Sequence, residues 1–203
     1  MGLSPGALTF LLLAVVLVFT WQSIFTANKD LARAKAWGDL LRRALPFFVL
    51  IVMALSLPAV QTFEGNGTVV WIAVFAVLIV GASLLAAPML ERKANRAFKK
   101  GDYDEAARMF RELAESRPLP RNYAFLGAAL GASERYEESV KSSTQAIEKD
   151  PEYGLAYYNR ALILLKMKRK EKARQDFQRA LEADTPRRFR QAARSQLTDL
   201  KKV

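Results

Sequence analysis

The chain has 203 residues, a formal net charge of +11, 51% hydrophobic residues, and no Cys or His. The missing thiol and imidazole groups exclude disulfides, cysteine or histidine nucleophiles and the usual zinc and haem ligand sets. The charge is uneven, because residues 91–203 hold 26 Lys and Arg against 17 Asp and Glu, a net charge of +9. Composition therefore predicts no metal and no cofactor, and it separates an apolar first part from a basic second part.

Three long apolar runs occupy residues 1–90, which we expect to form a membrane domain. An α-helix needs about 20 apolar residues to cross roughly 30 Å of hydrocarbon, and each run approaches that length. None of the runs contains Asp, Glu, Lys or Arg, so nothing in them resembles an ion or proton pathway. We therefore expect an anchor of three transmembrane helices, at about residues 7–27, 44–63 and 68–90.

Basic residues flank these runs on one side only. Five lie between the first two runs and five follow the third, whereas residues 1–6 and 61–68 contain none. Since Lys and Arg accumulate in cytoplasmic segments, we expect the N-terminus outside a bacterial-type inner (plasma) membrane and residues 91–203 in the cytoplasm. The five residues after the third run either contact anionic lipid headgroups, as we expect, or only mark the cytoplasmic side. They are Arg92, Lys93, Arg96, Lys99 and Lys100.

The segment between the first two runs has its own pattern. Leu31, Ala34, Trp37 and Leu41 recur at helical spacing among basic residues. This predicts either a helix that lies on the inner leaflet, with its charges toward the headgroups, or a plain cytoplasmic connecting helix.

Residues 91–186 repeat with a period of 33 to 34 residues. The stretch Gly101-Asp102-Tyr103-Asp104-Glu105-Ala106 is echoed by Glu134-Arg135-Tyr136-Glu137-Glu138-Ser139 and by Arg169-Lys170-Glu171-Lys172-Ala173. The pattern resembles the tetratricopeptide repeat family, and the resemblance implies pairs of antiparallel helices stacked in an α-solenoid. The expected fold class is all-α: three transmembrane helices, then about three repeats at about 91–118, 120–151 and 154–186, and a C-terminal capping helix at 187–201.

Small residues recur at two positions of each unit, and a packing residue recurs at a third. Gly or Ala at a helix crossing lets two backbones approach where a Leu would separate them. Ser143 departs from the family's pattern, because it replaces the large residue of the middle unit. The capping helix is apolar on one face only, as a solvating end cap requires. The matching positions are Ala94, Gly127 and Ala161, then Ala106, Ser139 and Ala173, then Phe110, Ser143 and Phe177.

The resemblance implies that the first helix of each pair lines a concave groove. The side chains predicted to line the groove are mostly small and apolar, which suits an amphipathic helix or a hydrophobic peptide as a ligand. Two alternatives remain: the larger side chains pack between helices, or the capping helix fills the groove. The predicted groove residues are Asn95, Phe98, Ala124, Ala128, Leu155, Tyr158, Leu162 and Leu165.

One known use of the family is to clamp the C-terminal carboxylate tails of heat-shock chaperones with Lys, Asn and Arg side chains. The equivalent positions here hold Glu91, Asn95, Phe125, Leu155 and Asn159. Only isolated Asn residues remain of the clamp, so we do not expect this chain to bind such tails.

These patterns favour a membrane-anchored adaptor or scaffold that recruits a protein partner at the cytoplasmic membrane face. One alternative is an accessory or assembly subunit of a larger membrane complex. Another is nucleic-acid binding by the basic repeats, which is disfavoured because no stacking aromatics are interleaved with the cluster at residues 166–172. An enzyme is the least supported class, since the acidic residues at helix starts are explained by the helix dipole. The oligomeric state and the identity of the partner stay open.

Overall fold

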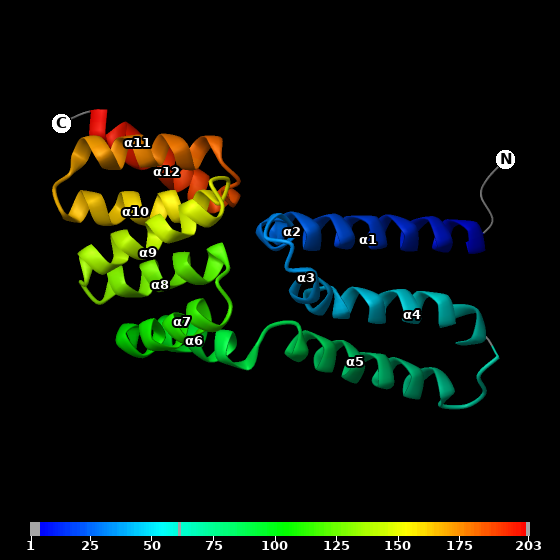
Figure 1. Cartoon of the computed structure of the whole chain (residues 1–203). Coiled ribbons are helices and arrows are strands. Elements are labelled where there is room, and N and C mark those ends of the chain that lie inside the picture. The colour runs from blue at the N-terminus through cyan, green and yellow to red at the C-terminus, as the bar shows by residue number, and fades with distance from the viewer. Residues whose placement is uncertain (1–4, 61, 202–203) are drawn as a thin grey trace. The chain divides into compact units, whose positions relative to one another are not determined.

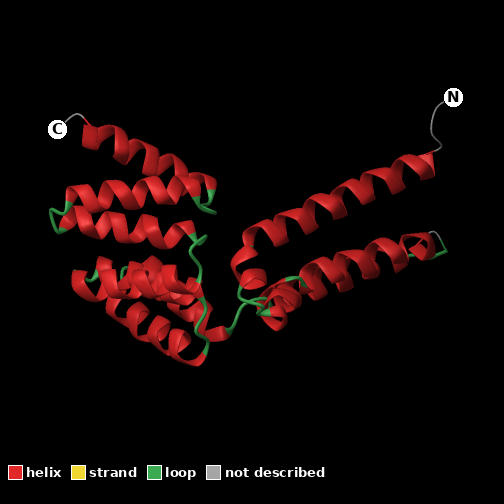
Figure 2. Cartoon of the chain, turned by 45° about the horizontal axis from the view of Figure 1, so that its top comes forward, coloured by secondary structure: helices red, strands yellow, loops and turns green. Residues whose placement is uncertain are grey.

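A computed structural model describes residues 5–60 and 62–201, and all regular elements in that part of the chain are helices (Figures 1 and 2). This confirms the all-α prediction. The chain divides into two compact units, which are Met1–Ala32 with Ala36–Pro88 and Arg33–Lys35 with Met89–Val203. Part of the predicted outer N-terminal segment, residues 1–4, and Gln61 of the predicted outer loop lie outside the described residues.

The helices before Pro88 follow the apolar runs with shifted ends. The third run was expected to continue to residue 90, but its helix ends at Leu85, because Pro88 disfavours helical backbone at the residue before it. The segment between the first two runs forms two short helices, separated where Lys35 adopts a left-handed φ of 55°. The five helices are α1 (Pro5–Ala27), α2 (Lys29–Arg33), α3 (Trp37–Arg43), α4 (Leu45–Val60) and α5 (Gly67–Leu85).

One helix among the described residues, α5, is long and apolar enough to cross a membrane, where the sequence predicts three such helices. The α3 and α4 helices meet the same criterion only as a pair, and they are bent by 50° at the break between them. Alone, the 16 residues of α4 extend about 24 Å, less than the roughly 30 Å of hydrocarbon. The α1 helix has 23 residues, and Ala14–Ala27 is the apolar stretch whose side chains the structure describes throughout; by itself this stretch is shorter than a membrane span.

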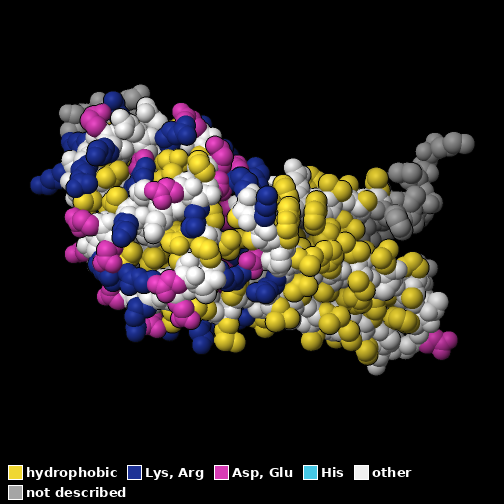
Figure 3. All heavy atoms as spheres, in the orientation of Figure 1, with side chains coloured by type: hydrophobic (Ala, Val, Ile, Leu, Met, Phe, Trp, Pro, Cys, Tyr) yellow, Lys and Arg dark blue, Asp and Glu magenta, His cyan; other side chains and the backbone are white. Residues whose placement is uncertain are grey.

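Large exposed hydrophobic side chains, among those that the structure describes, lie in the first part of the chain. Among the described side chains, every large hydrophobic residue that is exposed falls between Leu11 and Met89. Phe19 is 68% exposed, Leu55 72% and Val77 71%. Figure 3 shows hydrophobic side chains over the visible face of the first unit and dispersed charges over that of the second. A contiguous apolar surface of this kind marks contact with a membrane or a partner.

The second unit consists of three antiparallel helical pairs and a final helix. These agree with the predicted repeats, and the final helix has the predicted bounds of the cap. The buried core runs between the helices, with Phe110 in the first pair and Phe177 in the third almost fully enclosed. The helices are α6 (Met89–Lys100) and α7 (Tyr103–Ser116), α8 (Pro120–Ala132) and α9 (Tyr136–Lys149), α10 (Gly154–Lys166) and α11 (Lys170–Glu182), then α12 (Arg187–Lys201).

The turn inside each pair passes through a left-handed backbone position at the same place in the repeat. The residues are Gly101, Glu134 and Lys168, with φ of 89°, 62° and 60°. In each case the next amide donates to the carbonyl five residues back, which closes the end of the first helix. Gly adopts this conformation without a Cβ penalty, whereas the other two residues do so at some strain.

In the middle pair, α8 and α9 approach each other closely, and Ser143 stands at the packing position that Phe110 and Phe177 occupy in the other two pairs. All nine predicted crossing and packing positions are buried, and in this pair they are Gly127, Ser139 and Ser143. Ser139 Oγ donates to the Gly127 carbonyl at 2.6 Å. A Cβ added at Gly127 would lie 2.5 Å from Ser143 Oγ and 3.2 Å from the Ser139 carbonyl oxygen. The small residue at 143 therefore matches a crossing too tight for the large side chain of the family pattern.

Candidate functional site

The candidate surface comes from the first helices of the three pairs, α6, α8 and α10. Six of the eight predicted groove residues are partly exposed there, and two are buried. The partly exposed residues are Asn95, Phe98, Ala128, Tyr158, Leu162 and Leu165.

Ala124 and Leu155 are not available to a partner. Ala124 is fully buried in a cluster with Ala146 and Ala156, where α8, α9 and α10 meet. Its carbonyl oxygen accepts a hydrogen bond from Asn159 Nδ2 at 3.0 Å. Leu155 is 7% exposed. Ala124 packs between repeats, so for this position the alternative of packing between helices holds, and Leu155 is buried as well.

The α6 end of the surface is a half-exposed aromatic site. The Phe98 ring lies 5.3 Å from the Tyr103 ring and packs against the buried cluster around Phe110. Asn95 Nδ2 donates to the Glu91 carbonyl oxygen at 2.9 Å, so its amide stabilises its own helix. This end therefore offers mainly apolar contact.

The α10 end is partly covered by the capping helix α12. The Tyr158 ring lies 5.3 Å from the Phe189 ring and 5.9 Å from the Phe177 ring. Leu162 and Leu165 pack against the same cluster, together with Leu197 and Leu200 of α12. Burial raises the pKa of the Tyr158 phenol above its usual value, because an ionised ring is less well solvated there. The cap thus narrows the apolar surface but leaves these side chains half-exposed.

The positions equivalent to the chaperone-tail clamp do not form an anion site. Glu91 is buried and Phe125 packs its ring 5.5 Å from Phe110. The amides of Asn95 and Asn159 are engaged with backbone carbonyls. In the part of the chain that the structure describes, no group of three or more acidic side chains could hold a metal ion.

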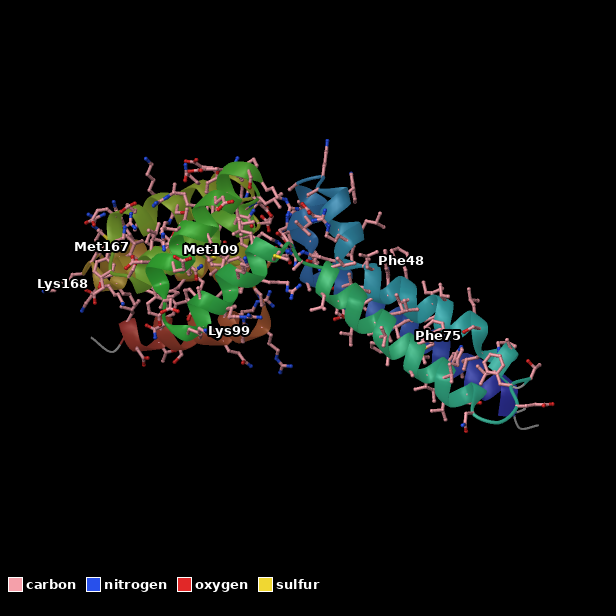
Figure 4. The ribbon with its side chains drawn as sticks, turned by 90° about the horizontal axis from the view of Figure 1, so that it is seen from below. Phe48, Phe75, Lys99, Met109, Met167 and Lys168 are labelled. Atoms are coloured by element: carbon pink, nitrogen blue, oxygen red, sulfur yellow. The ribbon has the colours of Figure 1, made fainter. Side chains whose placement is uncertain are left out.

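Basic side chains gather on one face of α6. Ala94 and Ala97 are buried, whereas Lys93, Arg96, Lys99 and Lys100 are exposed and Arg92 is half-exposed. Figure 4 shows the Lys99 side chain extending from this helix. The five predicted lipid-contact residues therefore reach solvent from a single amphipathic helix.

Sequence reasoning missed a polar network that links the third repeat to the second. Arg160 of α10 bonds to Asp176 of α11 and to Thr144 of α9. Hydrogen bonding to Asp176 raises the pKa of the Arg160 guanidinium, so it stays charged. Each of the two partners is 16 residues away along the chain, so no local pattern pointed to them.

The repeated helical pairs coincide with a match to a protein family. The model of the Tetratricopeptide repeat family matches residues 91–130 and 126–188. These residues, a little under half of the chain, therefore resemble tetratricopeptide repeats. The two matches cover the three helical pairs and the start of α12, which agrees with the resemblance drawn from the spacing of small residues.

The helical repeats also resemble parts of characterised proteins. The TPR repeat-containing thioredoxin TTL4 of Arabidopsis thaliana is 34% identical over 86 residues, which are 42% of this chain and 13% of that protein. The first TPR of Spaghetti (RPAP3), solved with the HSP90 peptide SRMEEVD, has 24% identity and a TM-score of 0.51, covering 56% of this chain and 88% of that one.

A further solved structure is the second TPR domain of human RPAP3 in complex with the HSP70 peptide SGPTIEEVD. It has 25% identity and a TM-score of 0.50, and it covers 55% of this chain and 92% of that chain. These likenesses support a fold of stacked helical repeats in the second unit.

Proposed function

We propose that the chain is a membrane-anchored adaptor, in which the apolar helices of residues 1–90, with α5 as a membrane span, hold the chain in a membrane and the tetratricopeptide repeats bind a protein partner in the cytoplasm. One observation carries the proposal: the exposed apolar surface that stops at Met89. In water, side chains such as Phe19, Leu55 and Val77 would be driven together by the hydrophobic effect. Lipid tails are as apolar as these side chains, so in a membrane the side chains can stay exposed. The anchor lies in a bacterial-type inner membrane.

The basic face of α6 supports the proposed orientation. It begins directly after the break at residues 86–88 that ends α5, so its charges follow the last apolar helix closely along the chain. Each Lys or Arg near an anionic leaflet is worth about 1 kcal/mol. Arg92, Lys93, Arg96, Lys99 and Lys100 thus hold the start of the repeats against cytoplasmic headgroups.

The partner segment is an apolar helix or peptide. The two RPAP3 domains were solved with chaperone peptides that end in Glu-Glu-Val-Asp, but the matching positions here carry Glu91, Phe125 and Leu155, which would not bind a carboxylate. The half-exposed Phe98, Leu162 and Leu165 suit apolar side chains spaced along one face of a helix. The repeats act as a scaffold without catalysis.

Membrane insertion is tested by alkaline extraction and by a reporter fused after Val203. We expect the full chain to stay with the membrane pellet at high pH, and the reporter to be active only in the cytoplasm. Release into the supernatant would overturn the anchor. A reporter active only on the outer side would overturn the orientation, and with it every cytoplasmic partner.

Partner binding is tested by proximity labelling from the C-terminus of the full chain. Leu162→Glu and Tyr158→Ala should remove the labelled partner, because they place a charge or a gap in the apolar surface. Gln178→Glu adds the same charge at an exposed position of α11 and should leave labelling intact. Labelling that survives both groove variants would place the contact elsewhere. A fixed set of membrane subunits that copurifies in mild detergent with every variant would favour the accessory-subunit alternative.

A further inference from the structure

The turn between α10 and α11 carries a dense group of positive charges at the end of the candidate groove. Residues 166–172 hold five Lys or Arg and one acidic residue, Glu171. All five basic side chains are exposed. Figure 3 shows Lys and Arg side chains at the edge of the second unit where Figure 1 places this turn. We call this group the basic turn, and its members are Lys166, Lys168, Arg169, Lys170 and Lys172.

The charges of the basic turn are not neutralised by neighbouring carboxylates. Glu171 pairs instead with Arg174 of α11, whose Nη2 lies 3.0 Å from Glu171 Oε2. Lys166 Nζ lies 5.5 Å from the centre of the Tyr136 ring, so this ammonium group rests on an aromatic face. Among the residues that the structure describes, none of the five members forms an ion pair. Their positive field therefore reaches about 8 Å into solvent at physiological salt.

The start of α11 carries charges of the sign that a helix start disfavours. The first turns of α7 and α9 contain acidic residues and no basic ones, whereas α11 begins with Lys170-Glu171-Lys172. A helix N-terminus is the positive end of the helix dipole, so Lys is unfavourable there. Lys168 adds strain at the left-handed position, which Gly101 avoids in the first pair. Local costs concentrated at one turn are typical of a functional site.

The basic turn continues the apolar surface of α10. Lys166 is the last residue of α10, directly after Leu165 and four residues after Leu162. Residues four apart share a face of a helix, so positive charge lies beside the two partly exposed leucines. None of the five basic residues occupies a position of the chaperone-tail clamp. A surface of this composition is complementary to a helix that carries acidic side chains beside an apolar face.

We propose that the partner of this surface is an acidic amphipathic helix, whose apolar side chains contact Leu162 and Leu165 and whose Asp and Glu side chains face the basic turn. The inference rests on the proposed partner binding and specifies the chemistry of the partner. A protein helix is favoured over a nucleic acid, because leucines border the cations and no aromatic residue stands among residues 166–172 to stack on a base. The charges accelerate association and select the partner, while apolar contact holds the complex together.

Two synthetic helical peptides of equal length test the charge preference. Both carry Leu along one face and a neutral fluorophore, and the opposite face carries Glu in one peptide and Gln in the other. Fluorescence anisotropy measures their binding to the full chain in a neutral mild detergent, with the detergent alone as the blank. We expect the chain to bind the Glu peptide about ten-fold more tightly than the Gln peptide at low salt, and this difference to shrink at high salt.

A triple substitution tests the basic turn itself. Lys168→Gln, Lys170→Gln and Lys172→Gln together should abolish the preference for the Glu peptide and leave binding of the Gln peptide unchanged. This variant should fold at least as well as the parent, because it removes two cations from the start of α11.

A second triple substitution is the matched control. It removes the same charge from exposed residues on the second helices of the three pairs, and it should keep the preference. The control substitutions are Arg108→Gln in α7, Lys141→Gln in α9 and Arg179→Gln in α11.

The outcomes separate this inference from the proposed function. Leu162→Glu should weaken the binding of both peptides. Equal binding of the two peptides by the parent, or a preference that survives the substitutions in the basic turn, would overturn the acidic partner and leave the apolar groove in place. Binding of neither peptide by the parent would overturn both proposals.

Two competitors test the other anionic partners. A single-stranded RNA that binds the parent more tightly than the Glu peptide, and loses this binding when the basic turn is substituted, would assign the turn to nucleic acid and overturn the inference. Displacement of the Glu peptide by phosphatidylglycerol added to the detergent, but not by phosphatidylcholine, would overturn it in favour of a lipid headgroup.

Discussion

Arg160 and Asp176 form a doubly hydrogen-bonded ion pair that joins α10 to α11. Arg160 Nε donates to Asp176 Oδ2 at 2.7 Å, and Nη2 donates to Oδ1 at 2.8 Å. A third bond, from Nη1 to Thr144 Oγ1 at 2.9 Å, extends the contact to α9 of the preceding repeat. Because Asp176 is buried and Arg160 half-buried, this network fixes how the third repeat stacks on the second.

Asp176→Ala should lower the free energy of unfolding by about 3 kcal/mol, because it leaves the Arg160 charge partly buried without its carboxylate. Thermal unfolding of the full chain in mild detergent, followed by circular dichroism, measures the loss. Glu182→Ala breaks the exposed pair with Arg179 in the same helix and should lose less than about 1 kcal/mol. Equal losses in the two variants would contradict a structural role for the buried pair.

Gly127→Ala should destabilise the repeats by about 1 to 2 kcal/mol, even though Ala is the better helix former. The new Cβ would meet Ser143 Oγ and the backbone atoms Ser139 O and Ser143 N of α9. The backbone atoms cannot rotate away from it. Gly131→Ala is the comparison, since its Cβ would meet mainly the flexible end of Ile163. A smaller loss at 131 than at 127 is expected in the same unfolding experiment, and the reverse order would refute the close crossing of α8 and α9.

Lys168→Gly should stabilise the chain by about 0.5 to 1 kcal/mol, because Gly adopts the left-handed conformation at this turn without strain. Figure 4 labels Lys168 beside Met167, at the turn between α10 and α11. Gln175→Gly, at an exposed position within α11, should instead lose about 1 kcal/mol. A loss at both positions would show that the turn carries no strain.

Tyr158 should ionise at a higher pH than an exposed tyrosine. Burial raises its pKa in the folded chain, so the neutral phenol is favoured there relative to the unfolded chain. Its contribution to stability is complete below the unfolded pKa of about 10 and is lost as the pH rises through the folded pKa. Tyrosinate absorbance during alkaline titration, with Tyr158→Phe to assign the signal, measures the shift.

Phe189→Ala should move the Tyr158 titration back toward its usual range, because Phe189 supplies part of the burial from α12. It should also expose Leu162 and Leu165 further without changing α10. An unchanged titration would show that the cap does not cover this end of the surface.

Much of the structure of the second unit can be predicted from the amino-acid sequence. The period of 33 to 34 residues predicted the helical pairs, and the small residues at crossings predicted which positions are buried, down to Gly127 and Ser143 in the middle pair. The bounds of the cap also follow from its apolar spacing. Such features are local or repeat along the chain, so each is constrained by the residues that surround it in sequence.

The composition of the binding surface depends on how the repeats stack. Ala124 looks like a groove residue on its own helix, yet Ala156 of the next repeat packs against it, and Leu155 is also buried. The contact of Phe189 with Tyr158 and the pairing of Arg160 with Asp176 likewise arise from packing between segments. Helical periodicity identifies the face on which a side chain lies, but its exposure depends on which distant element packs against that face.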